Sequence, residues 1–210
     1  MRDNEIISKI CRCASLYRQN LVNKNYMIVY DVSDKEAALS PEMIETVFAA
    51  QNFLHLTGVF THLKPVQFYE RCADSRLKKS DFTKPSNGVH EQKLRVLHEL
   101  VCPHIYCKMI GGFNGNGFYL ETSRVMGSVR GAMGFKIPEQ APNFYVPNTV
   151  LEGDVRDRVC KPYRILAMLR KQIKEARYER VCYVAKGVEL CDINPFLQST
   201  GRCAENLIIE

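Results

Sequence analysis

The stretch GSVRGAMGF, residues 127–135, decides the fold class, because glycine recurs in it at positions 127, 131 and 134 among apolar residues. Apolar runs that glycine interrupts in this way are typical of short strands joined by tight turns. Residues 118–122 before it and residues 144–147 after it have the same character. We therefore predict an antiparallel meander in this part of the chain.

The first hundred residues carry mostly helical patterns. Three segments predict helices, because apolar residues recur in them at three- and four-residue steps: 5–21, 65–77 and 91–102. The apolar runs 26–30 and 43–47 predict two strands. Because helices come first and most of the sheet follows, the order of elements indicates an α+β fold rather than alternating βαβ units.

The segment 162–190 allows two interpretations. A helix beginning at Pro162 would place Ile165, Leu169 and Ile173 on one face. Residues 163–170 and 180–186 equally fit two strands of a long basic hairpin, and periodicity does not decide between them. We favour the hairpin, because the run 181–185 is rich in β-forming residues and needs a neighbouring strand.

Length and composition predict one compact domain. The chain has 210 residues, of which 46% are hydrophobic and 25% are charged, and these values are typical of globular proteins rather than disordered chains. We expect a single domain over residues 1–194 and a short, mobile tail over residues 195–210. No run approaches the roughly 20 apolar residues of a membrane span, and the first residues do not resemble a signal peptide. A cytoplasmic protein without membrane contact is expected.

Positive charge is concentrated near the C-terminal end. The net charge is +6, and residues 156–186 hold ten Lys and Arg residues against three acidic residues. A basic segment on an otherwise nearly neutral chain indicates a polyanionic partner such as RNA. A solvated charged face without a partner is an equal alternative on charge alone.

The cysteines and histidines do not form a recognisable metal motif. Nine cysteines with irregular spacing are expected to be free thiols in a reducing compartment, because a chain of this length can build its core without disulfides. The pairs that do occur lack the spacing of zinc sites. The sequence also lacks HExxH and GxSxG motifs. We therefore expect neither a metal nor another cofactor.

His55 is the strongest candidate for acid–base chemistry. It interrupts an apolar run two residues before Thr57, and a histidine exchanges protons near neutral pH. The alternative is a buried histidine that donates to a backbone carbonyl. Arg130 is expected in the middle of a strand, either at a sheet edge or directed into a cleft. Lys171 lies in the basic segment, where simple solvent exposure is its alternative.

These residues suggest RNA cleavage without a metal. The 2′-hydroxyl of RNA can attack the adjacent phosphate when one group accepts a proton, another donates one, and cations stabilise the transition state. The glycine-rich loop 111–117, by contrast, lacks the ending of a phosphate-binding loop and predicts a turn or hinge. Arg124 is isolated in the sequence and carries no signal of its own.

Four motifs in order resemble a known family: 52–58 (NFLHLTG), 127–135, 145–150 (YVPNTV) and 183–186 (YVAK). They resemble phage and mobile-element proteins of Gram-positive bacteria that are grouped with the barnase–EndoU–colicin–RelE-like nucleases, as their fourth phage-type subgroup. The resemblance runs from about residue 5 to residue 193. It implies N-terminal helices, a twisted and mostly antiparallel sheet, and a metal-independent ribonuclease site on one sheet face.

The resemblance also implies site residues. His55 would be the general acid or base, Thr57 would position it or donate to a phosphate oxygen, and Arg130 would bind phosphate. Lys171 is added from the basic segment. The backbone of RNA would be held by further basic residues: Arg156, Arg164, Lys174 and Lys186.

Two other functions remain open at this point. A basic phage protein of this size can bind and inhibit a host or defence nucleoprotein complex, as an anti-CRISPR or other anti-defence factor would, without being an enzyme. A structural phage component is the third possibility, and it predicts self-association without RNA affinity. Fold alone does not choose between activities.

Overall fold

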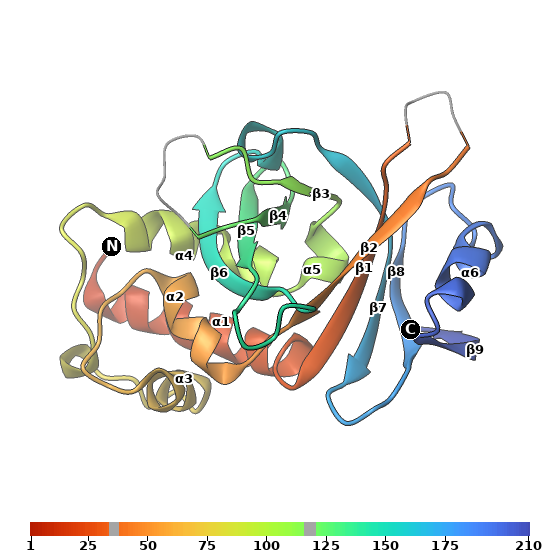
Figure 1. Cartoon of the computed structure of the whole chain (residues 1–210). Coiled ribbons are helices and arrows are strands. Elements are labelled where there is room, and N and C mark those ends of the chain that lie inside the picture. The colour runs from red at the N-terminus through yellow and green to blue at the C-terminus, as the bar shows by residue number, and fades with distance from the viewer. Residues whose placement is uncertain (34–37, 116–120) are drawn as a thin grey trace.

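The computed structural model describes residues 1–33, 38–115 and 121–210 (Figure 1). The α-helices are α1 (Asp3–Asn20), α2 (Phe53–Thr57), α3 (Pro65–Ala73), α4 (Val89–Leu100), α5 (Pro103–Tyr106) and α6 (Leu190–Ser199). The strands are β1 (Lys24–Asp31), β2 (Pro41–Val47), β3 (Met109–Gly112), β4 (Arg124–Gly127), β5 (Gly131–Lys136), β6 (Val146–Glu152), β7 (Tyr163–Gln172), β8 (Tyr178–Val184) and β9 (Cys203–Ile209). Short 3-10 turns occupy Ala50–Asn52, Lys79–Asp81 and Val155–Arg158. The α+β class is confirmed.

Seven strands form a curled antiparallel sheet in the order β2-β1-β7-β3-β4-β5-β6. The curl brings its two edges together, because the Tyr145 amide donates to the Glu45 carbonyl at 2.8 Å and the Val47 amide donates to the Tyr145 carbonyl at 2.9 Å. β7 is paired with β1 along one edge and with β3 and then β8 along the other. β9 extends the sheet beside β8 as a parallel strand.

Helices α1 to α4 cover the inner face of this sheet, to one side of it in Figure 1. Tyr17 of α1 shows how closely the layers pack. Its ring is fully buried and lies 5.3 Å from the ring of Phe53 and 6.3 Å from that of Phe48, while its hydroxyl donates to the Ala49 carbonyl at 3.0 Å. A buried aromatic ring whose hydroxyl finds a partner contributes area without an unsatisfied polar group.

The glycines of the 127–135 stretch allow close packing. A Cβ atom at Gly131 would lie 2.8 Å from the Cβ of Val96, so α4 can lie against β5 only if this position is glycine. At Gly134 a Cβ would meet the methyl groups of Thr122 and Thr149 at 2.9 Å. The pattern that predicts the meander therefore also lets a helix and neighbouring side chains approach the strand.

The hairpin interpretation of the basic segment is confirmed by β7 and β8, and the helix alternative is wrong. Most of the expected strand 118–122 lies outside the described residues, and β4 begins at Arg124. The expected strand 144–147 overlaps only the start of β6, which runs from Val146 to Glu152. The apolar run 52–59 holds the short helix α2 and its terminating Gly58.

Residues 195–210 do not form a loose tail. They contain the second half of α6 and all of β9, so residue 194 lies inside a helix. Ile193 and Leu197 of α6 are fully buried in a second core with Met27 and Val29 of β1. None of the helices within the described ranges is long and apolar enough to cross a membrane.

The second core gives the first prediction. Replacing Leu197 with alanine removes a fully buried side chain, and the free energy of unfolding should fall by about 2–4 kcal/mol in urea denaturation. Glu205→Ala, on the exposed surface of β9, is the matched control and should leave stability nearly unchanged. Equal stability of the two variants would mean that the C-terminal segment does not pack as described.

Candidate active site

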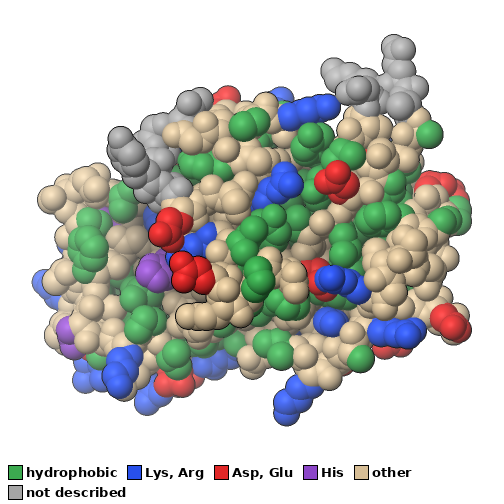
Figure 2. Space-filling model, viewed as in Figure 1, with side chains coloured by type: hydrophobic (Ala, Val, Ile, Leu, Met, Phe, Trp, Pro, Cys, Tyr) green, Lys and Arg blue, Asp and Glu red, His purple; other side chains and the backbone are tan. Residues whose placement is uncertain are grey.

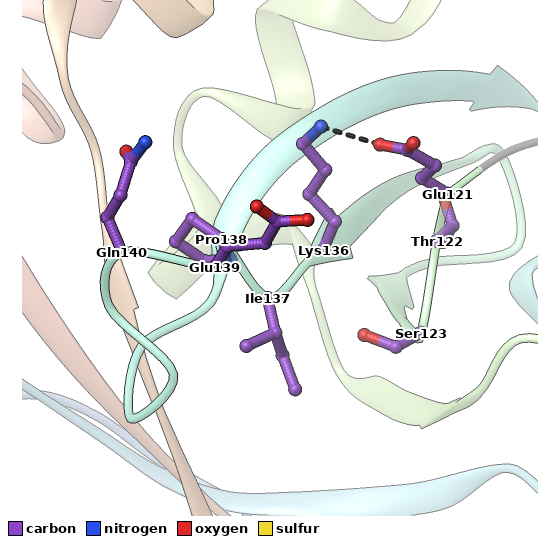
Figure 3. Close-up of a pocket in the computed structure, with 8 residues that line it drawn as sticks. All are labelled: Glu121, Thr122, Ser123, Lys136, Ile137, Pro138, Glu139 and Gln140. Atoms are coloured by element: carbon purple, nitrogen blue, oxygen red, sulfur yellow. Dashed lines mark hydrogen bonds and ion pairs between the residues drawn. The ribbon is translucent and has the colours of Figure 1, made fainter.

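A hollow of about 790 Å³ opens at the rim of the curled sheet, between residues 121–123 and residues 136–140 (Figure 3). Lys136 at the end of β5 pairs with Glu121, with 2.7 Å between Nζ and Oε2. The amide group of Asn148 on β6 donates to the Glu121 carbonyl at 3.2 Å. The hollow is therefore lined mainly by polar and charged residues at the end of β5, in the turn that follows it and in the segment just before β4.

His55 lies on the exposed side of the short helix α2. Phe53 and Leu56 of the same helix are buried in the main core, which leaves His55 on the outer side. Gly58 ends the helix with a φ of 73°, a conformation that favours glycine. The buried Thr57 hydroxyl donates to the Leu54 carbonyl at 2.8 Å. Thr57 therefore fixes the end of the helix and does not reach the surface.

Two lysines flank His55. The Lys93 ammonium on α4 donates to the His55 carbonyl at 2.8 Å, and Lys136 at the hollow is close enough to act on the imidazole electrostatically. Partial burial, Lys93 and Lys136 all lower the pKa of His55 below its ordinary value of 6.5. The imidazole is therefore mainly neutral at pH 7 and can accept a proton.

Lys93 is itself perturbed. Burial lowers the pKa of its ammonium from 10.5 to about 8, and its aliphatic chain packs beside Gly58, where a Cβ atom would come within 2.9 Å of the lysine Cδ. A lysine that titrates near neutral pH beside a histidine is a candidate for proton transfer. Lys93 and Lys136 carry no signal in the sequence, because they reach His55 only through the packing of α2 against α4 and against β6, which pairs with β5.

Arg130 does not lie beside His55. It occupies the turn between β4 and β5 rather than a strand, and its Nη1 lies 2.7 Å from Oε1 of Glu99. Glu99 is buried near the end of α4, six residues after Lys93, which is about 9 Å along a helix. Arg130 therefore neutralises a buried carboxylate, while most of its own side chain remains exposed.

Lys171 does not line the hollow either. It lies near the end of β7, donates to the Ala176 carbonyl at 3.0 Å and stands 4.7 Å above the ring of Tyr178. Other residues of the basic segment are similarly engaged. Arg156 pairs with Asp154, and Arg164 donates to the Lys186 carbonyl. The side chains of Lys174 and Lys186 are exposed. Arg156, Arg164 and Lys171 are therefore each engaged by groups other than His55.

The family comparison agrees with this architecture. The model of a family described as phage-Barnase-EndoU-ColicinE5/D-RelE like nuclease 4 matches residues 9–187. The chain belongs to this family. The expected family and fold are thereby confirmed, and the nuclease class is supported. The match ends before α6 and β9, so the second core combines residues of the family region with a C-terminal segment beyond it.

No curated protein and no solved structure matches this nuclease-family chain. All nine cysteines are free thiols. Across residues 1–33, 38–115 and 121–210, no group of three or more His, Cys, Asp or Glu side chains is placed to hold a metal ion.

The lowered pKa of Lys93 has a consequence for stability. Because its pKa is lower in the folded than in the unfolded protein, the unfolded chain binds the extra proton between about pH 8 and pH 10.5, and stability rises through that range. Below pH 8 the cost of burying the charge is fully present. Lys93→Met should therefore raise the free energy of unfolding at pH 7 by about 1 kcal/mol.

Urea denaturation at pH 7 and near pH 10 tests this prediction. The difference between Lys93→Met and the original protein should shrink at the higher pH. Lys174→Met, which removes an exposed ammonium, is the control and should change little at either pH. A destabilised Lys93→Met at pH 7 would show that the ammonium is well solvated or favourably paired.

Proposed function

We propose that this protein cleaves RNA without a metal, by attack of a ribose 2′-hydroxyl on the adjacent phosphate. The observation that carries the proposal is the position of His55. It is a mainly neutral imidazole between Lys93, whose pKa is about 8, and Lys136 at a polar hollow, in a chain of a nuclease family. A phage origin and a cytoplasmic location accompany this proposal.

His55, Lys93 and Lys136 have separate roles in the proposed reaction, which together account for its proton transfers and its charge. The 2′-oxygen bonds to phosphorus as His55 accepts its proton, and the bond from phosphorus to the 5′-oxygen breaks. The Lys93 ammonium donates a proton to that leaving oxygen. Lys136 stabilises the charge that accumulates on the phosphate. The products are a 2′,3′-cyclic phosphate and a 5′-hydroxyl.

The other expected site residues take different roles in this proposal. Thr57 is a positioning residue that holds the end of α2 through the Leu54 carbonyl. Arg130 supports α4 through Glu99. Lys171 and the basic residues of the C-terminal half would bind the RNA backbone away from the cleavage point. Salt weakens such electrostatic contacts. This second group comprises Arg156, Arg164, Lys174 and Lys186.

Cleavage in EDTA tests the proposal. The purified protein should convert bacterial RNA into fragments ending in 2′,3′-cyclic phosphate, and His55→Ala should lower the rate by about 100-fold or more while the fold persists. His62→Ala, which removes another exposed imidazole, should retain full activity. Intact RNA with a folded, RNA-binding protein would reject cleavage and favour an inhibitor of a nucleoprotein complex instead.

The pH profile tests the two proton-transfer roles separately. The rate should rise as His55 loses its proton, below the ordinary value of 6.5, and should fall as Lys93 loses its proton near pH 8. Lys93→Met should lower kcat and abolish the alkaline fall. An unchanged alkaline limb in this variant would assign the proton donor to another group.

A further inference from the structure

A second polar cluster lies in the mouth of the curled sheet, where inner-face side chains of several strands converge. We call it the mouth cluster, and it consists of Tyr30, Glu42, Arg124, Tyr145 and Tyr163. These residues come from β1, β2, β4, the residue before β6, and β7. In Figure 2, charged side chains lie among hydrophobic ones near the middle of the molecule, on the face turned to the viewer.

The tyrosines of the mouth cluster offer both rings and hydroxyls. Tyr30 is buried and donates to Oε2 of Glu42 at 2.9 Å. The ring of Tyr163 is half-buried, 5.8 Å from that of Tyr30, and its remaining surface is available to another flat group. Lys161 stands 5.4 Å from the centre of the Tyr163 ring. Aromatic rings on which a base can stack, beside cations that attract the backbone, are the two features that single-stranded nucleic acids use.

Arg124 supplies fixed positive charge in the same place. Burial opposes its charge, but a hydrogen bond with Tyr145 and the nearby Tyr30 and Glu42 outweigh this and hold its pKa above the ordinary range. Opposite it on β3 is Gly112, where a Cβ atom would meet, among the described residues, only the Arg124 guanidinium within 4 Å. The missing side chain leaves room between the described residues beside a guanidinium, which is the group that best matches phosphate oxygens.

The shape of the sheet limits what can enter. Small closed barrels have interiors that their own side chains fill, and here Ile28, Phe48, Phe135 and Met168 occupy the interior beneath the mouth cluster. Ser123, which lines the hollow together with Lys136, is the neighbour of Arg124 in the chain, so one segment connects the hollow to the mouth cluster. A base that has left its helix can reach the mouth, whereas a paired base inside a duplex is shielded by its strands.

We propose that the mouth cluster binds an unpaired nucleotide of the RNA, with its phosphate on Arg124 and its base stacked on Tyr163. This inference rests on the proposed function, because it names the substrate as single-stranded or looped RNA. It also assigns specificity to residues separate from those that transfer protons. The same arrangement orders the strand across the hollow, toward Lys136 and His55.

Binding of a short 2′-O-methyl RNA measures the subsite without cleavage, because the methyl group removes the attacking hydroxyl. Fluorescence anisotropy should show much tighter binding to the single strand than to the same strand annealed to its complement. Tyr163→Leu should weaken binding roughly tenfold, while Tyr163→Phe, which keeps the ring, should not. Arg124→Gln should weaken it by a similar factor and reduce the salt slope by about 1. Arg95→Gln, at a surface ion pair with Glu152, is the matched control and should have no effect.

Three results would each overturn the subsite. The first is equal affinity for the single strand and the duplex, and the second is no binding to either. The third is an affinity of both Tyr163→Leu and Arg124→Gln within about twofold of the original protein's. Melting temperatures of all variants show whether a loss of RNA affinity is caused by misfolding. Tyr163→Phe keeps the ring and removes only the hydroxyl, so it measures the contribution of the hydroxyl to binding. Failure of the two proposals is distinguishable. Correct binding without cleavage rejects the catalytic proposal alone, whereas cleavage with an unchanged KM in Arg124→Gln rejects the subsite alone.

Discussion

Burial of β1 and β7 on both faces is the constraint on which the rest of the structure depends. The side chains of Tyr26, Ile28 and Tyr30 point into the helical core, and those of Met27 and Val29 point into the second core. A strand buried on both faces must find cover on each side. The curl, the helical layer and the C-terminal segment all supply that cover, and the rim of the curl is where polar side chains can gather.

The fold contains buried carboxylates whose charge is neutralised by arginines. Asp81, Glu45 and Glu99 are all nearly inaccessible to solvent, and each pairs with an arginine that is partly exposed. The arginines are Arg71, Arg202 and Arg130. A buried carboxylate left without its partner would be strongly destabilising, since its charge would have no compensation. Arg130 is the example that bears on the site. The sequence suggests that it binds phosphate, whereas in the structure it pairs with the buried Glu99 near the end of α4.

The sequence predicts elements better than it predicts the site, and the reason is physical. Periodicity and glycine spacing report local packing, so α1, β1 and the β7–β8 hairpin could be inferred, as could the helices-then-sheet order. A site depends on contacts between distant segments. His55 could be proposed because a histidine interrupts an apolar run. Lys93 and Arg124 gave no signal, because their importance arises from α2 packing on α4 and from the convergence of strands at the mouth. The C-terminal segment was misjudged, because its exposed residues obscure the buried positions Ile193, Leu197 and Cys203.

The segment beyond the family match changes both the stability and the electrostatics of the domain. Without residues 188–210, the outer faces of β1 and β7 would expose Met27, Val29 and Leu166 to water, so in this chain the extension belongs to the core. Its last residue, Glu210, pairs with Arg170 and approaches Arg180. Two of the cations that make the segment 156–186 basic are therefore compensated within the protein. Net charge in the sequence therefore overstates the field that an RNA would meet there. In the proposed mechanism the cations that meet the RNA are Lys93 and Arg124, and partial burial makes each of them act at short range.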